Sequence, residues 1–136
     1  KKIKFYVAND LKLCVLIKSD GIYLSSYNCS FKHLNLKKLN FDIIGSAHNF
    51  KEINLKSKQK CDYILLSKLF MVAYDKQSPF LGILKYSKYL HVINKKLIPL
   101  GGINSNNLTK LNILNCVGLA LMSEVKKKPA IIDRLF

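Results

Sequence analysis

Arginine is nearly absent from this chain: Arg134 is the only one, so lysine supplies the rest of the 23 basic residues. With only 8 acidic residues the formal charge is +15, which by itself favours a partner such as nucleic acid or an anionic membrane. Arginine, however, is the residue that grips bases and phosphates through two parallel hydrogen bonds. Because the lysines are also spread along the sequence, we expect no specific nucleic-acid partner and favour attraction of small phosphorylated metabolites.

Metal-binding spacings and long apolar runs are missing as well. The cysteines form no C-x-x-C pair and have no histidine at ligand spacing, which argues against a zinc site. We therefore expect a cytoplasmic protein whose cysteines are reduced thiols: Cys14, Cys29, Cys61 and Cys116. No apolar run approaches the ~20 residues that cross a bilayer, and we find no signal peptide, so we expect no membrane partner.

The chain is short. Its 136 residues, 49% of them hydrophobic, fit a single globular domain spanning residues 1–136. A complete (β/α)₈ barrel usually needs ~200 residues or more. The sequence also starts at Lys1 without a methionine, so we expect an amino-terminal segment to precede it.

Short apolar runs alternate with helical patterns along the sequence. The runs are nearly continuous, which is typical of parallel strands buried on both faces. They predict strands at Ile3–Ala8, Gly21–Ser25, Phe41–Ser46, Asp62–Ser67, Leu97–Gly101 and Val117–Met122. Apolar spacing and capping residues predict helices at Leu11–Lys18, Asn49–Lys60, Leu81–Asn94 and Ser105–Leu114, with a further helix start at Pro129. This order predicts an α/β fold with a parallel sheet.

Two segments near the carboxyl end predict a phosphate site. LIPLGGIN at Leu97–Asn104 and CVGLALMS at Cys116–Ser123 each read as a strand that ends in small residues. Gly101 and Gly102 let backbone amides approach an anion closely. Asn104 or Ser105 can then cap a helix, whose amino end carries partial positive charge. Two such units in tandem look like the last two of a (β/α)₈ barrel, whose loops commonly bind phosphate. An asparagine-capped helix after a tight turn is the alternative.

Small or polar residues also follow the first four predicted strands. Barrels keep their catalytic groups at these carboxyl ends. The residues are Asn9 and Asp10, Ser25 and Ser26, Ser46 and His48, and Ser67 and Lys68.

Taken in order, the segments resemble the thiamine-phosphate synthase/TenI family. DGIYLSS at Asp20–Ser26 is similar to that family's DGVHLGQ strand, and IGSAHN at Ile44–Asn49 to its G-x-S-x-H segment. CDYILLSKLF at Cys61–Phe70 resembles its A-D-Y-x-x-x-G-P-x-F strand. AND at Ala8–Asp10 is similar to its I-N-D, and PLGGIN and GLALMS are similar to its last two strands.

The resemblance implies a (β/α)₈ barrel, of which this chain carries about six βα units, the family's strands three to eight. It implies thiamine biosynthesis: coupling of hydroxymethylpyrimidine diphosphate to thiazole phosphate, with release of pyrophosphate whose charge Mg²⁺ neutralises. Six strands do not close an eight-stranded barrel, so we expect the first two strands upstream of Lys1. Edge pairing in a homo-oligomer and poor solubility are the alternatives.

The resemblance also implies roles for individual residues. Asp10 would hold Mg²⁺, and Asn9 would lie beside the pyrimidine. Ser46 would donate to the pyrophosphate, and His48 matches the acid/base histidine with which the TenI branch tautomerises a thiazole. The thiazole phosphate would be bound by Gly101, Gly102, Met122 and Ser123. The family has a substrate-binding lysine after its fourth strand, and Lys76 or Asp75 aligns with it, depending on a one-residue gap.

Departures from the family pattern favour other functions. The basic Arg-x-Lys segment has no counterpart before Lys1, and Asn28, a poor Mg²⁺ ligand, falls near the second metal carboxylate. Lys68 and Val72 replace a proline and a threonine. A TenI-like thiazole tautomerase and a non-catalytic protein that binds a phosphorylated thiazole are therefore the alternatives.

Structural roles stay open for several of these residues. Asp10 could cap the following helix, and His48 could make a structural hydrogen bond. We expect Lys68 and Lys76 to be solvated, and we expect no role for the remaining histidines, His33 and His91.

Overall fold

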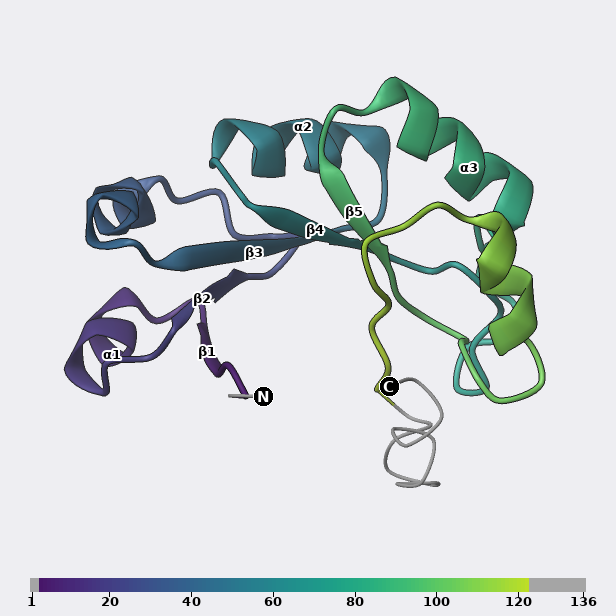
Figure 1. The fold of residues 1–136 in the computed structure, drawn as a ribbon, viewed down its shortest axis with the longest axis horizontal. Coiled ribbons are helices and arrows are strands. Elements are labelled where there is room, and N and C mark those ends of the chain that lie inside the picture. Colours follow the sequence, from purple (N-terminus) through teal and green to yellow (C-terminus); the bar gives the residue numbers. More distant parts are fainter. Residues whose placement is uncertain (1–2, 123–136) are drawn as a thin grey trace. The chain divides into compact units, whose positions relative to one another are not determined.

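The computed structural model describes residues 3–122, so Ser123 and the predicted helix start at Pro129 lie outside the described residues. The strands are hydrogen-bonded in chain order, as repeated βα units require. They are β1 (Tyr6–Ala8), β2 (Gly21–Leu24), β3 (Asp42–Ala47), β4 (Tyr63–Leu66) and β5 (Lys96–Pro99). The helices are α1 (Leu11–Leu16), α2 (Phe50–Lys58) and α3 (Gly82–Val92), with 3₁₀ helices η1 (Lys32–Leu39) and η2 (Leu108–Ile113), as Figure 1 shows.

The chain forms two compact units, Lys1–Leu65 and Leu66–Phe136, called here the amino-terminal and carboxyl-terminal units. In the amino-terminal unit β1, β2 and β3 pair in parallel, with Tyr6 opposite Gly21 and Gly21 opposite Asp42. Helix α1 packs against β1 and β2, and α2 packs against β3. The continuous apolar runs are explained by this arrangement, because helices cover the sheet.

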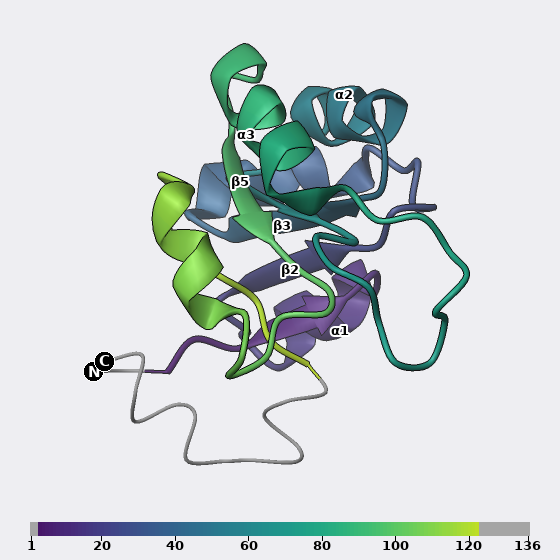
Figure 2. The same ribbon diagram turned by 90° about the vertical axis from the view of Figure 1, so that its right-hand side faces the viewer.

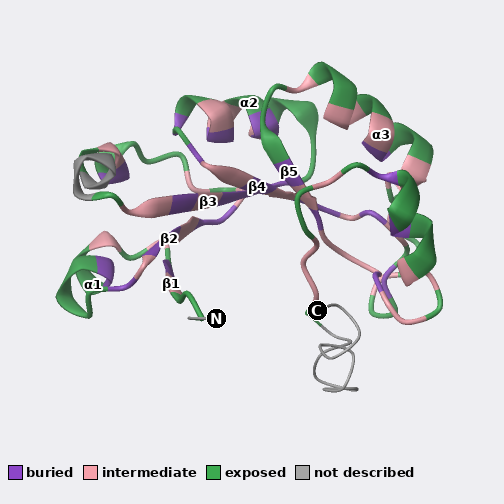
Figure 3. Ribbon diagram, in the orientation of Figure 1, coloured by how far each residue is buried: buried purple, intermediate pink, exposed green. Residues whose placement is uncertain are grey.

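The predicted capping box at the start of α2 is confirmed. The Glu52 amide donates to Asn49 Oδ1 at 2.9 Å, and the Glu52 carboxylate accepts from the His48 amide at 2.8 Å. These bonds satisfy amides that the first helical turn leaves unpaired. Helix α2 then buries Ile53 against the sheet, where Ile22, Leu24 and Ile43 are also buried (Figure 3).

The carboxyl-terminal unit holds the end of β4, β5, α3 and η2. The Leu100 amide donates to Leu66 O at 3.1 Å, and the Leu69 amide donates to Leu100 O at 2.9 Å, so β4 and β5 stay paired beyond their ends. The connection from β4 to α3 is a long loop, seen in Figure 2. The core of this unit includes Tyr86 of α3 and Leu97 of β5.

The predicted sixth strand, Val117–Met122, is wrong for the described residues. The only pairing there is one parallel bridge between Leu100 and Ala120, with the Ala120 amide 2.9 Å from Pro99 O. Val117 and Met122 are 62% and 58% exposed. A continuous apolar run forms a buried strand only where both faces are covered, and this run lacks that cover.

The predicted helix Ser105–Leu114 is also corrected, to the shorter 3₁₀ helix η2. The asparagine side chains before it bond to the backbone: Asn104 Oδ1 accepts from the Asn106 amide, and Asn107 Oδ1 accepts from the Asn104 amide, both at 2.9 Å. Such local bonds compete with a regular helix and favour turns. The positive helix end predicted beside Gly102 is therefore absent from the described chain.

Candidate functional site

Asn9, predicted beside the pyrimidine, lies where β1 ends, with a positive φ of 57°. Its Oδ1 accepts from the Ser25 amide at 3.0 Å, the Ser25 hydroxyl at 3.1 Å and Asn28 Nδ2 at 2.9 Å. Three donors saturate that oxygen. The amide nitrogen of Asn9 is 3.5 Å from the Tyr27 hydroxyl, at the limit of a hydrogen bond, so it remains able to donate to a ligand.

Asp10, predicted to hold Mg²⁺, is the N-cap of α1. Its Oδ1 accepts from the Leu13 amide at 2.9 Å, which is the capping role that the sequence left open. Both ends of the neighbouring Asn28 amide are also engaged, with its Oδ1 accepting from the Ser30 amide at 2.9 Å.

The described residues offer no complete set of protein ligands for a magnesium ion. Residues 3–122 contain no group of three or more histidine, cysteine, aspartate or glutamate side chains able to enclose a metal. Mg²⁺ prefers oxygen ligands, and here it would find one oxygen of Asp10. No step below is therefore assigned to a metal.

Ser46 and His48 lie at the end of β3. The Ser46 side chain is 6% exposed, and its hydroxyl makes no hydrogen bond to another described residue. A hydroxyl at a strand end that is bound to no described residue remains able to donate, which makes Ser46 a candidate donor for a ligand. His48 is exposed, and its backbone amide is bound to Glu52.

The Gly101–Gly102 loop, where the sequence predicts a phosphate site, follows β5. Both glycines have positive φ, 96° and 69°. The Gly102 carbonyl accepts from Asn107 Nδ2 at 2.8 Å and Asn104 Nδ2 at 3.2 Å. The amides of Gly102 and Ile103 donate to no other residue among those described. With its carbonyl fixed by asparagines, the loop has backbone donors left for a ligand.

Close packing explains why glycine occupies position 102. A Cβ there would lie 2.4 Å from Met71 O and 2.7 Å from Phe70 O, shorter than any ordinary contact. At Gly101 it would lie 3.2 Å from Lys68 Cα. The loop after β4 thus packs its backbone directly on the glycines. This packing requires glycine at position 102, while the predicted approach of the loop to an anion stays a prediction.

Lys68 is not simply solvated, as the sequence suggested. Its ammonium is 2.7 Å from Asp75 Oδ2, and its side chain is 18% exposed. This hydrogen bond, with that of the Ser78 amide, holds the pKa of Asp75 below its ordinary value. Asp75 is thereby occupied, whereas Lys76 next to it is exposed and makes no bond to a described residue. Of the two residues that could align with the family's lysine, Lys76 is therefore the one available to a phosphate.

The remaining predicted residues are less informative. Met122 is exposed at the end of the described chain, and Ser123 lies outside it. His33 is buried, with Nε2 2.9 Å from Gln59 O, while His91 is exposed on α3 with Nδ1 2.8 Å from Ser87 O. Both contacts are structural.

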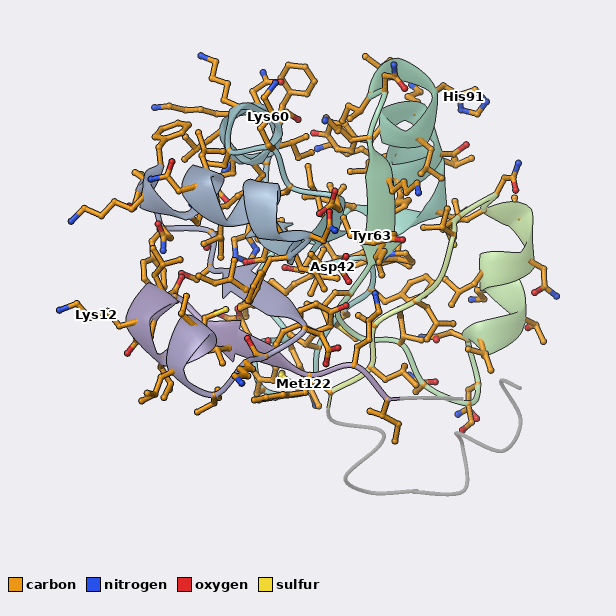
Figure 4. All side chains as sticks on the ribbon, turned by 60° about the vertical axis from the view of Figure 1, so that its left-hand side comes forward. Lys12, Asp42, Lys60, Tyr63, His91 and Met122 are labelled. Carbon is orange, nitrogen blue, oxygen red and sulfur yellow. The ribbon has the colours of Figure 1, made fainter. Side chains whose placement is uncertain are left out.

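A second polar cluster lies at the opposite ends of these strands. Asp42, at the start of β3, accepts from Lys4 Nζ at 2.6 Å and from the Tyr6 hydroxyl at 3.0 Å. Burial, together with the carboxylate, raises the pKa of Tyr6 to about 12. Figure 4 shows Asp42 among the strands, while Lys12 extends outward from α1. Because the cluster is at the amino ends, we assign it a structural role.

The sequence did not reveal two buried residues, Lys56 of α2 and its C-cap Gln59, whose side chains bond the loop after β2. A lysine within a helix rich in lysine reads as solvated, so no sequence signal could have found it.

Among residues 3–122, every helix is too short or too polar to span a bilayer.

Comparisons with known proteins agree with the arrangement. The sequence model of a family described as thiamine monophosphate synthase matches residues 1–125. The thiamine-phosphate synthase of Methanococcus vannielii is 22% identical over 121 residues, which cover 89% of this chain and 59% of that protein. The thiamine-phosphate synthase of Prochlorococcus marinus subsp. pastoris is 30% identical over 120 residues, 88% of this chain and 34% of that protein. The chain thus spans about three fifths or less of these relatives.

A solved structure of thiamine phosphate pyrophosphorylase from Pyrococcus furiosus superimposes with a TM-score of 0.74 at 18% identity. The superposition covers 97% of this chain and 66% of that one. The likeness confirms the predicted fold type, an α/β barrel of which this chain carries a part, with five strands in its described residues.

Proposed function

The chain belongs to the thiamine monophosphate synthase family, and we propose that it acts as a thiamine-phosphate synthase, coupling hydroxymethylpyrimidine diphosphate to thiazole phosphate with release of pyrophosphate. Its substrates would be small phosphorylated molecules, and its location the cytoplasm. We further propose that residues 1–136 contribute to a single barrel domain that needs further strands to close.

The observation that carries the proposal is the Gly101–Gly102 loop. A phosphate needs several N–H donors in a concave backbone, and the unpaired amides of Gly102 and Ile103 supply two. The Gly102 carbonyl is occupied by hydrogen bonds from two asparagines. In the proposal these amides bind the thiazole phosphate, with Met122, Ser123 and the free ammonium of Lys76 as further contacts.

The diphosphate substrate is assigned to residues of the amino-terminal unit. Asn9 offers only donors, the two N–H groups of its amide nitrogen, which suit an acceptor nitrogen of a pyrimidine ring. The unpartnered hydroxyl of Ser46 would donate to the leaving pyrophosphate. Mg²⁺ dependence stays a prediction of the family resemblance. Among the residues predicted for this site, Asp10 is the one that offers a carboxylate to the ion.

A second candidate is favoured by that sparse donor set. A TenI-like thiazole tautomerase needs no diphosphate and no metal, and His48 would be its acid or base. A protein that only binds a phosphorylated thiazole needs the Gly102 loop alone. Both use the feature that carries the first proposal.

One assay separates the candidates. The chain is incubated with hydroxymethylpyrimidine diphosphate and thiazole phosphate, with Mg²⁺ or with excess chelator, and thiamine phosphate is measured by mass spectrometry. Product that depends on Mg²⁺ supports the synthase, and full activity in chelator contradicts the predicted metal role. Tautomerisation of the thiazole that is lost in His48→Asn supports the second candidate. Binding of thiazole phosphate without turnover leaves the non-catalytic protein.

A further inference from the structure

Lys56 is a fully buried lysine whose ammonium contacts no carboxylate among its hydrogen-bond partners. Its Nζ donates to Ser25 O at 2.7 Å, Asn28 O at 2.9 Å and Gln59 Oε1 at 3.1 Å. An ammonium has three N–H donors and no acceptor, so three oxygens satisfy it. Burial lowers the pKa of Lys56, because taking the charge out of water is unfavourable. A costly group with so complete a set of partners calls for an explanation.

Gln59, one turn further along, binds the same loop. Its Nε2 donates to Asn28 O at 2.9 Å and Ser30 O at 2.7 Å. Both side chains therefore clasp Ser25–Ser30, which we call the β2 loop. Three of its carbonyls, those of Ser25, Asn28 and Ser30, are held from α2.

The same loop is also held by Asn9. As described above, Asn9 Oδ1 accepts two bonds from Ser25 and one from Asn28. Asn9 has a positive φ, which asparagine tolerates, and its three hydrogen bonds to the loop hold its side chain. The chain of contacts thus runs from Lys56 through the β2 loop to Asn9.

The sheet provides a path for the lysine. A Cβ at Gly45 of β3 would lie 2.8 Å from Lys56 Cδ, so the aliphatic stem passes directly over the glycine. The stem packs against β3, and the ammonium at its end donates to carbonyls of the β2 loop. The lysine is therefore built into the interior, with its position fixed at both ends.

We propose that Lys56 is a positioning residue: its buried ammonium fastens the β2 loop, which fixes Asn9 so that only the Asn9 amide nitrogen is left for a ligand. The site then selects a ligand that presents a hydrogen-bond acceptor. The step from Asn9 to the pyrimidine rests on the proposed function, whereas the fastening of the loop does not.

Hydrogen exchange tests the fastening. Lys56→Met keeps the stem and removes all three donors, while Lys58→Met changes an exposed lysine of the same helix and is the matched control. We expect amides of residues 25–30 to exchange about tenfold faster or more in Lys56→Met, with residues 11–16 and the control unchanged. Unchanged exchange in the loop, or equal acceleration in residues 11–16, overturns the proposal.

Gln59→Leu keeps the test decisive if Lys56→Met does not fold. It removes two donors to the β2 loop and leaves the Lys56 bonds to Ser25 and Asn28 in place. We expect the same local acceleration in residues 25–30, smaller than tenfold. Exchange equal to wild type in this variant would contradict the proposed clasp.

Ligand affinity separates positioning from general stability. Calorimetric titrations use hydroxymethylpyrimidine diphosphate and, separately, thiazole phosphate. We expect Lys56→Met to weaken the first by about tenfold and to leave the second within about twofold, because the Gly102 loop is not part of the network. Equal weakening of both overturns the positioning role. If the wild-type chain binds neither compound, the proposed function fails, and hydrogen exchange still decides the role of Lys56.

Discussion

Replacing Gly102 by alanine tests the loop on which the proposed phosphate site depends. The added Cβ meets two obstacles: a backbone with φ of 69°, and the carbonyl oxygens of Met71 and Phe70 at 2.4 and 2.7 Å. The left-handed backbone costs an L-residue about 1–2 kcal/mol. Relieving contacts that short requires a backbone shift, which costs about 1–3 kcal/mol more.

Gly82 provides a matched control. Its φ is 70°, and a Cβ there would have no atom within 4 Å. Gly82→Ala therefore carries the backbone cost without the collision, about 1–2 kcal/mol. We expect urea unfolding to give a free energy of unfolding for Gly102→Ala about 1–3 kcal/mol below that for Gly82→Ala. Equal losses for the two variants would refute the close approach of the loop after β4 to Gly102.

Three further predictions concern Asp10, the Lys68–Asp75 pair and Tyr86. Asp10→Ala should lose about 1 kcal/mol of stability in urea unfolding, whereas Asp10→Asn still caps α1 and should lose little; a tenfold loss of activity in a stable Asp10→Asn would contradict a purely capping role. Because the folded pKa of Asp75 is depressed, its stabilising contribution is complete above the ordinary value of 3.8 and is lost as pH falls below it; melting curves at decreasing pH should show this decline, and a wild-type profile in Asp75→Asn would exclude it. The Tyr86 hydroxyl is buried without a partner among the described residues, so Tyr86→Phe should be neutral or stabilise by up to about 2 kcal/mol, and a clear loss in thermal melting would mean that the hydroxyl is satisfied.

The sequence predicted the strands that burial defines. The runs around Ile22, Ile43 and Ile64 are continuous because helices and neighbouring strands cover them, and this pattern is readable without a structure. The capping signals at Asp10 and Asn49 were equally readable, since each side chain bonds an amide three residues later. These features depend on neighbouring residues and on burial, and both leave a pattern in the sequence itself.

What the sequence did not predict depends on particular tertiary contacts. The short η2 follows asparagine side chains that bond their own backbone, a competition that periodicity does not record. The burial of Lys56 requires a glycine on β3 and a turn of carbonyls from the β2 loop, which are far away in sequence. Likewise, the pairing of Lys68 with Asp75 depends on the path of the loop between them.

The proposed function depends on binding of a thiazole phosphate by the Gly101–Gly102 loop. The most direct measurement is a titration of the ¹⁵N-labelled chain with thiazole phosphate and with the same thiazole lacking its phosphate, followed by the amide signals of Gly102 and Ile103. We expect both signals to shift with the phosphorylated compound, binding to be at least about tenfold weaker without the phosphate, and Gly102→Asp to abolish binding. Equal affinity for the two compounds, or shifts that leave Gly102 and Ile103 unchanged, would contradict this role of the loop.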